Sequence, residues 1–386
     1  MREPEPLQQV DRTYVLSGGR KLSYFSGCDY FRLSSHPRVL AAMQAGAKKY
    51  GLNVAASRLT TGNHRLYREL EDSLCSFFGA DSCLLVATGY VTNLIACQAL
   101  AGNFSHALLD ERAHPSLVDA VRFLDCPVLK FRHREPLDLD RTVARCGPGA
   151  KLLLLTDGMF SHDGSAAPLN EYLKILPRDA LLLVDDAHGA GVLGRTGKGT
   201  LEHCGVNRSR IVQTITLSKA FGTYGGAILA TSPFRQQILD SSRLFIGHTP
   251  LPLPLANAAL EGVRVLKTDK TLRARLLRNV TFVKVGCARS AIGRTEGCTS
   301  PGAAPILSFT PDSTRAAAKL ERRLLGSGIF PPLVKYPGAR KDGYFRFVIS
   351  SEHTRSQLEA LINSLEEKPK TAHPARWTTK SRASGQ

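Results

Sequence analysis

The stretch "TITLSKAFGTYGGAILA", residues 214–230, places a lysine between an apolar run and a glycine-rich turn. A lysine at the mouth of a buried strand is costly to desolvate as an ammonium ion. Its pKa therefore falls, and its free amine can condense with a carbonyl compound. Lys219 is a candidate for such a Schiff base. A lysine before a glycine turn is more often a solvated loop residue, so the surrounding pattern has to decide between the two interpretations.

Similar short apolar runs recur along the chain with helical segments between them. The runs cover residues 83–88, 106–110, 128–131, 151–156, 181–185, 211–217 and 226–230. The segment "HRLYRELEDSLCSFFG" (64–79) has apolar residues at helical spacing before a glycine, which predicts a helix. Alternating strands and helices predict an α/β fold with a mostly parallel sheet flanked by helices. Because the strands are continuously apolar, we expect both faces of the sheet to be covered.

The order of these patterns predicts four segments. We expect an N-terminal segment, a large α/β domain, a smaller C-terminal α+β domain that begins at a proline-rich run, and a disordered basic tail. The tail has five Lys or Arg after Glu367 and no acid. The expected boundaries are 1–50, 51–247, 248–366 and 367–386.

Composition limits the function classes. At 386 residues and 43% hydrophobic, the chain can bury one large core or two modest ones. No apolar run approaches the roughly 18 residues of a membrane span, and the start of the chain does not resemble a signal peptide, so a cytoplasmic location is expected. The nine cysteines include no C-x-x-C pair, which disfavours a disulfide framework and a zinc site. The net charge of +18 suits a phosphorylated cofactor or substrate; a nucleic-acid partner is not expected.

Ligands of such sheets bind at the carboxyl ends of the strands, so polar residues that follow the apolar runs are candidate site residues. "VATGYVTN" (86–93) lies between a strand and a helix, where backbone N–H groups and the helix dipole can hold a phosphate. "LLLVDDAHGAGVLG" (181–194) ends its strand at an aspartate, with a histidine three residues on. The candidates of this kind are Gly89, Tyr90, His114, Asp185, His188 and Thr216.

Together with Lys219, these residues can hold pyridoxal 5′-phosphate (PLP). That cofactor needs an acid opposite its pyridine nitrogen, residues that bind its phosphate, and an aromatic side chain stacked on its ring. Asp185 can supply the acid, Gly89–Tyr90 with Thr216 can bind the phosphate, and His114 can stack on the ring. Each residue alone has an ordinary interpretation as a cap, a turn residue or a packing residue, so the ordered combination carries the prediction.

The same residues carry a family resemblance. "VDDAHGAGVLGRTGKG" (184–199) followed by "TLSKAFGTYGG" (216–226), and preceded by "TGYVTN", "ERAHPSL" and "TDGMFSHDGSAAPL", resembles the α-oxoamine synthase family of fold-type-I PLP enzymes. The resemblance extends from about Tyr30 to His353. Within the family, the D-D-A-H-G motif is most similar to that of the 8-amino-7-oxononanoate synthase branch. The resemblance implies a fold-type-I transferase that acts as a homodimer.

The resemblance also implies roles for individual residues. Lys219 would form the Schiff base and move protons, Asp185 would pair with the pyridine nitrogen, His188 would bond the ring hydroxyl and His114 would stack on the ring. Arg346 in "YFRFVISSEH" matches the arginine that holds the amino-acid carboxylate, although a structural ion pair is the alternative. The implied phosphate ligands are Gly89, Tyr90 and Thr216, with His248 or Thr249 of a second subunit.

Ser161, after "TDGMF", either reaches the cofactor edge or serves the turn. The remaining departures from the family fall where substrates would bind: Cys28 and Arg32 in "CDYFRL", Tyr67, and Phe330. These departures leave the amino acid, the acyl donor and the bond-forming step open.

The implied reaction is the decarboxylative condensation of an amino acid with an acyl-CoA, which gives an α-amino ketone and CoA. In the most similar branch, the substrates are L-alanine and a pimeloyl thioester, and the reaction serves biotin synthesis. An aminotransferase, another α-oxoamine synthase with altered substrates, and a non-catalytic protein that inherited the fold are the alternatives.

Overall fold

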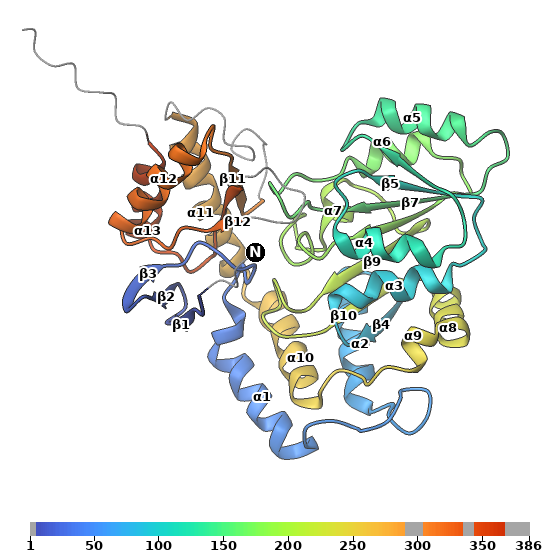
Figure 1. Cartoon of the computed structure of the whole chain (residues 1–386). Coiled ribbons are helices and arrows are strands. Elements are labelled where there is room, and N and C mark those ends of the chain that lie inside the picture. Colours follow the sequence, from blue (N-terminus) through green and yellow to red (C-terminus); the bar gives the residue numbers. More distant parts are fainter. Residues whose placement is uncertain (1–4, 290–303, 335–342, 367–386) are drawn as a thin grey trace, which may run out of the picture.

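The computed structural model describes residues 5–289, 304–334 and 343–366, and these residues form two lobes (Figure 1). The predicted basic tail, 367–386, lies outside the described residues. The larger lobe contains a seven-stranded sheet with helices on both faces. The smaller lobe combines a three-stranded sheet with the helices of the C-terminal part.

The large sheet has the strand order β4-β10-β9-β8-β7-β5-β6. Only β10 runs antiparallel to its neighbours, so the predicted mostly parallel α/β sheet is confirmed. The strands are β4 (Ser82–Val86), β5 (His106–Asp110), β6 (Val128–Phe131), β7 (Leu152–Asp157), β8 (Leu181–Asp185), β9 (Ile211–Thr216) and β10 (Gly226–Ala230).

The run of four leucines in β7 shows why the strands are continuously apolar. Successive side chains of a strand point to opposite faces of the sheet. Leu152 and Leu154 belong to a core cluster with residues of α5 and α6 on one face, whereas Leu153 and Leu155 belong to a cluster with residues of α3 and α4 on the other. Both faces are therefore buried, as expected.

The helices of the large lobe begin with α2, the predicted helix. It buries its apolar side and ends at Gly79, whose φ of 66° is a left-handed conformation that suits glycine. None of the described helices is long and apolar enough to cross a bilayer. The helices are α2 (Arg65–Phe78), α3 (Gly89–Ala99), α4 (Pro115–Ala120), η2 (Val121–Phe123), α5 (Pro136–Arg145), α6 (Leu169–Ile175), α7 (Thr200–His203), α8 (Ser232–Ser241) and α9 (Arg243–Ile246).

The N-terminal part of the chain contacts both lobes. Ser23 pairs with Ile329, and the Val348 N–H donates to the Phe25 carbonyl at 2.9 Å, so the N-terminal strands lie beside the small lobe. After η1, the helix α1 packs instead on α10. These elements are β1 (Gln8–Val10), β2 (Tyr14–Ser17), β3 (Arg20–Ser23), η1 (Leu33–Ser35), α1 (Pro37–Tyr50) and α10 (Leu253–Thr268).

The small lobe contains β11 (Ile306–Phe309), β12 (Leu333–Val334), β13 (Tyr344–Val348), α11 (Lys270–Arg289), α12 (Thr314–Gly326) and α13 (Arg355–Leu365). Its helix α11 packs on α13, whereas α10 packs on α1 and α2. We therefore propose that the junction between the two domains lies at Asp269, between α10 and α11, and not at residue 248.

Candidate active site

Lys219 lies just beyond the carboxyl end of β9. Its Nζ is 2.9 Å from Nε2 of His188, and Nδ1 of His188 is 2.7 Å from the Tyr30 hydroxyl. Burial lowers the pKa of Lys219 below its ordinary value, although Cys28 and Asp185 nearby act in the opposite direction. Burial, aided by Lys219, lowers the pKa of His188 well below its ordinary value. A neutral imidazole thus faces an amine that loses its proton more readily than an exposed lysine.

The turn after Lys219 explains how the lysine reaches this position. The Leu217 N–H donates to the Gly225 carbonyl at 2.9 Å, which closes the turn between β9 and β10. Gly222 has φ +64°, and a Cβ there would lie 2.4 Å from the backbone nitrogen of Ser34. Only glycine allows both this conformation and the close approach to η1. The buried Phe221 then anchors the turn in the core.

Asp185 ends β8 as predicted, and three donors surround its carboxylate. The Asn93 amide donates to Oδ2 at 2.6 Å, the Ser116 hydroxyl donates to the same oxygen at 3.3 Å, and the Ala187 N–H donates to Oδ1 at 3.1 Å. Sequence reasoning missed Asn93. Its sequence signal was an amide in the helix that directly follows the predicted phosphate turn, whereas its complete burial, 0% exposed, is visible only in the structure.

A second buried carboxylate, Asp157, stands beside Asp185 and was also missed. The two residues are paired in register at the ends of β7 and β8. Burial and the charge of Asp185 raise the pKa of Asp157 well above its ordinary value. Its Oδ2 accepts the His114 N–H at 2.8 Å. Asp157 therefore favours the protonated state.

His114 caps α4, and it is also part of the site. Its Nδ1 accepts the Ser116 N–H at 3.2 Å and lies 2.7 Å from the Ser116 hydroxyl. Its ring meets the Tyr90 ring edge-on, with 6.1 Å between centroids. The Tyr90 hydroxyl donates to Asp119 at 2.5 Å. The group of Tyr90 that remains available to a phosphate is therefore its backbone N–H.

Gly89 and Thr216 form a close contact at the N-terminus of α3. A Cβ on Gly89 would lie 2.6 Å from Cβ of Thr216, so glycine is required there. Thr216 Oγ1 is 2.8 Å from the hydroxyl of Ser218, a residue that sequence reasoning did not single out. Two hydroxyls beside the free N–H groups of a helix N-terminus suit a phosphate.

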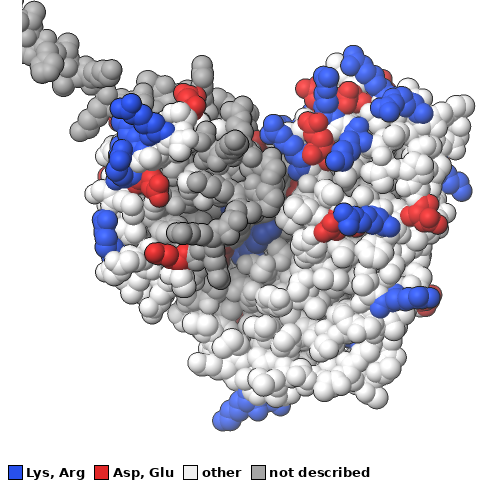
Figure 2. Space-filling view, in the orientation of Figure 1, with Lys and Arg blue, Asp and Glu red and all other residues white. Residues whose placement is uncertain are grey.

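Arg346 approaches from the small lobe. Its Nε donates to the Ser161 carbonyl at 2.5 Å, and its Nη2 lies 3.4 Å from Sγ of Cys28. Ser161 thus contributes its backbone to positioning the guanidinium. Burial alone would raise the pKa of the Cys28 thiol, but Arg346 and Lys219 lower it below its ordinary value. The site therefore lies between the lobes, where Figure 2 shows basic side chains within the hollow.

Comparison with known proteins identifies the family. The family model described as "Aminotransferase class I and II" matches residues 25–365. The chain belongs to this family. Its relatives include an 8-amino-7-oxononanoate synthase of Thioalkalivibrio sulfidiphilus, 35% identical over 90% of this chain and 88% of that protein. Another relative of the same name, from Nitrosococcus oceani, is 32% identical over 90% of this chain and 91% of that protein.

Two solved family structures are similar throughout. Serine palmitoyltransferase from S. paucimobilis aligns with a TM-score of 0.85 and 26% identity, covering 93% of this chain and 90% of that one. An 8-amino-7-oxononanoate synthase from Francisella tularensis aligns with a TM-score of 0.75 and 25% identity, covering 88% and 96%. Both neighbours are α-oxoamine synthases, so the predicted family, the fold-type-I architecture and the PLP cofactor are confirmed. This member of the family is a PLP-dependent acyltransferase.

The arrangement of side chains fits the cofactor. The amine of Lys219, the carboxylate of Asp185 and the Gly89–Thr216 cradle come together from three separate strand ends, as a PLP site requires. The individual roles given to these residues stay predictions. His248 and Thr249 were predicted to act across a subunit interface. Within one chain, His248 Nδ1 bonds the Leu244 carbonyl at 3.0 Å and Thr249 is exposed.

Three of the four departures from the family pattern have structural partners. Arg32 donates to the Tyr24 carbonyl at 3.1 Å, and the buried Tyr67 hydroxyl donates to the Leu251 carbonyl at 2.6 Å. Phe330 packs against the Tyr24 ring, with 6.2 Å between centroids. Cys28 differs, because it contacts the candidate substrate arginine.

Proposed function

We propose that the chain condenses an amino acid with an acyl thioester, with loss of carbon dioxide, to give an α-amino ketone and the free thiol. The proposed substrates are those of 8-amino-7-oxononanoate synthases, L-alanine and a pimeloyl thioester, as in biotin synthesis. The observation that carries the proposal is the contact of the Lys219 amine with the neutral His188, close to the Arg346 guanidinium. The relatives with this name, at 32–35% identity, support the choice of branch.

PLP, when bound, supplies an electron sink for the α-carbon of the amino acid. Lys219 would take a proton from that carbon and return one later, a role that its lowered pKa supports. Asp185 would hold a proton on the pyridine nitrogen, and its three donors keep its carboxylate in position. His188 would bond the ring hydroxyl, and His114 would cover the ring.

Phosphate binding would use the N-terminus of α3. The backbone N–H groups of Gly89 and Tyr90 have no intrahelical partners, and the Thr216 hydroxyl lies beside them. Ser218, 2.8 Å from Thr216, would extend this set.

Substrate binding would depend on Arg346. A guanidinium can hold a carboxylate with two parallel hydrogen bonds, which orients the group that leaves as carbon dioxide. Its Nε bond to the Ser161 carbonyl fixes the direction of the side chain. Cys28 lies on the other side of the guanidinium and would face the same carboxylate.

We also propose that the protein is a homodimer. In the orientation of Figure 1, the face over α1, α2, α9 and α10 carries few charged side chains in Figure 2. Leu52 is 72% exposed, and Leu40, Leu59 and Ile246 are each exposed as well. A face with few charged side chains, together with exposed apolar residues in and next to these helices, supports a subunit interface. The interface would bring His248 or Thr249 of the second subunit to the phosphate. We further propose a cytoplasmic location.

An assay of thiol release tests the proposed reaction. The PLP-loaded protein is incubated with L-alanine, glycine or L-serine, with and without pimeloyl-CoA or shorter acyl-CoAs. We expect release of CoA and carbon dioxide in equal amounts, only when both substrates are present, and none from Lys219→Ala. Formation of a keto acid without acyl-CoA would refute the proposal and establish an aminotransferase.

A further inference from the structure

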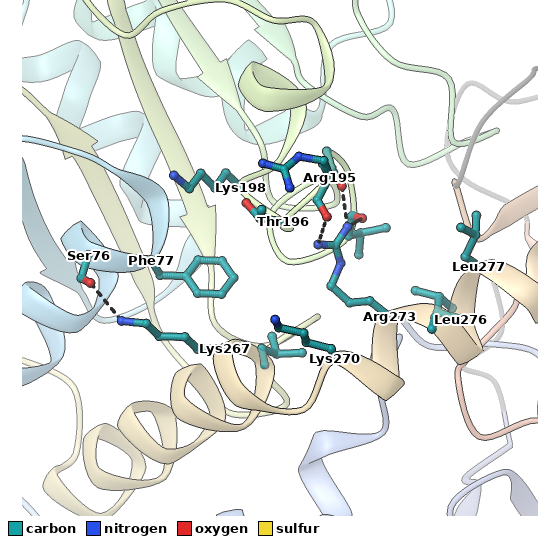
Figure 3. A pocket seen from close by; sticks show the side chains of 14 residues that line it. Ser76, Phe77, Arg195, Thr196, Lys198, Lys267, Lys270, Arg273, Leu276 and Leu277 are labelled. Atoms are coloured by element: carbon teal, nitrogen blue, oxygen red, sulfur yellow. Dashed lines mark hydrogen bonds between the residues drawn. The ribbon is translucent and has the colours of Figure 1, made fainter.

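A large pocket lies at the junction of the two lobes, apart from the residues that surround Lys219. It has a volume of about 730 Å³. Its walls come from the end of α2, the loop after His188, the end of α10 and the start of α11 (Figure 3). Pockets of this size accept ligands much larger than a single phosphate. None of its wall residues belongs to the site described above.

The pocket is strongly basic. Figure 3 shows cationic side chains from the loop on one wall and from α10 and α11 on the opposite wall. No acid lines the pocket among the described residues. Two acids of the same segments are already engaged: Glu202 accepts backbone N–H groups of the loop, and Asp269 accepts the Thr271 N–H at 2.9 Å. The cations are Arg195, Lys198, Lys267, Lys270 and Arg273.

Three of these cations have structural partners. Arg273 donates to loop carbonyls, including that of Gly194 at 2.5 Å. Lys267 donates to the Ser76 hydroxyl at 3.1 Å. Lys198 Nζ lies beside Gly79, where the negative end of the α2 dipole favours a cation. These contacts account for the position of each of the three side chains.

The positions of the Arg195 and Lys270 side chains are not explained by such contacts. Both are exposed, and no described residue forms an ion pair or a hydrogen bond with either side chain; only the Arg195 backbone carbonyl is bonded, by Arg273 at 3.1 Å. Lys270 is the first residue of α11, where the positive end of the helix dipole disfavours a cation. Two unpaired cations on facing walls would therefore stabilise a bound anion that spans the pocket.

The pocket also has an apolar part. Phe77, Leu266 and Leu276 line it with largely buried side chains, and Leu277 is 49% exposed. A ligand that matches both parts has several negative charges and an apolar or aromatic group. We propose that this pocket binds an organic polyphosphate, of the class that includes nucleoside triphosphates and the nucleotide end of coenzyme A. For a free polyphosphate the proposal adds a second binding site; for the nucleotide end of coenzyme A it rests on the proposed function and extends the site of the acyl donor.

A ligand between Arg195 and Lys270 would connect the lobes. Arg195 belongs to the loop that follows His188, and Lys270 begins the first helix of the small lobe. The loop also packs close to the active-site lysine, because a Cβ on Gly191 would lie 2.6 Å from Cβ of Ala220. Binding would therefore link the two sides of the domain junction and raise the thermal midpoint of the protein.

Calorimetric titration of the PLP-loaded protein tests the site. The probes are ATP, adenosine 3′,5′-bisphosphate and inorganic tripolyphosphate. The test variant is Arg195→Ser with Lys270→Ser, and the matched control is Arg278→Ser with Lys319→Ser, which removes two exposed cations outside the pocket. We expect the test variant to bind at least about tenfold more weakly than the wild type, since two charge-assisted contacts are lost. The control should bind as the wild type does.

The probes distinguish the source of the ligand. Binding of ATP and tripolyphosphate would support a site for free polyphosphates, and selective binding of the bisphosphate would support the nucleotide end of coenzyme A, provided that the test variant loses it. Circular dichroism and cofactor absorbance show that both variants are folded. The proposal is overturned if no probe binds the wild type, or if the test variant and the control bind equally.

Discussion

Replacing Gly89 by alanine tests the predicted phosphate cradle. The new Cβ would lie 2.6 Å from Cβ and 2.7 Å from Oγ1 of Thr216. Carbon atoms in favourable contact are about 3.5–4.0 Å apart, so one partner must move by about 1 Å. Rotation of the Thr216 side chain can move Oγ1 but not Cβ, which the backbone fixes, so the N-terminus of α3 or the end of β9 has to shift.

The cost follows from this overlap. Overpacking a well-packed site costs about 1–3 kcal/mol of unfolding free energy. A shift of α3 also displaces the N–H groups that would hold the phosphate. If a similar free energy is lost from binding, the dissociation constant for PLP rises by about 5- to 150-fold. We expect Gly89→Ala to weaken cofactor binding within that range.

Two assays measure the effect, and a second substitution controls for it. Titration of the apoprotein with PLP, followed by absorbance, gives the dissociation constant, and urea unfolding of the apoprotein gives the stability. Thr216→Gly removes both atoms of the clash. In that background, adding Gly89→Ala should cost almost nothing further, because the interaction is absent.

Two results would refute this reasoning. One is an unchanged PLP dissociation constant for Gly89→Ala, which would mean that the cradle does not hold the phosphate. The other is an equal loss of stability in both backgrounds, which would assign the cost to the helix terminus and not to Thr216.

Three further substitutions test the site and the fold. Cys28→Ser removes a thiol of lowered pKa beside Arg346. At high pH this thiol would be a thiolate that competes with the substrate carboxylate for Arg346. The KM for the amino acid should therefore fall by about fivefold, most clearly at high pH, with kcat little changed. An equal KM at all pH values would contradict this. Asn93→Ala removes a donor to Asp185, so PLP should bind about tenfold more weakly in an absorbance titration. Unchanged PLP binding would contradict the role proposed for Asp185 in holding the pyridine nitrogen. Burial lowers the pKa of His353 to about 3, so only the unfolded state gains this proton between about pH 6.5 and 3. The unfolding free energy should therefore fall as the pH is lowered through that window. His353→Gln should reduce the slope of unfolding free energy against pH by up to about 1.4 kcal/mol per pH unit. An unchanged slope would show that His353 titrates normally.

Part of the site could be predicted because it is local in sequence. Asp185 ends one buried strand and Lys219 lies three residues after another, and strands of this kind place their carboxyl ends at one edge of the sheet. Gly89 was predictable for the same reason, as the first residue of a helix after a strand. The number of residues between a strand end and a side chain is readable from the chain alone.

Other contacts depend on pairings that no spacing reveals. Tyr30 meets His188 across 158 residues, and Cys28 meets Arg346 across 318. Asn93 could be placed on a helix, but not toward Asp185, because the rotation of a helix over a sheet is set by packing.

The sequence by itself therefore determined the fold class, the strand ends and the cofactor, because hydrophobic periodicity and local motifs specify these without long-range contacts. Only the tertiary structure decided what surrounds Lys219, and it showed that α10 packs on α1 and α2. It also brought Arg195 and Lys270 to facing walls of one pocket. The physical reason is that burial and the neighbouring charges, which set pKa values and binding, arise only when distant segments pack together.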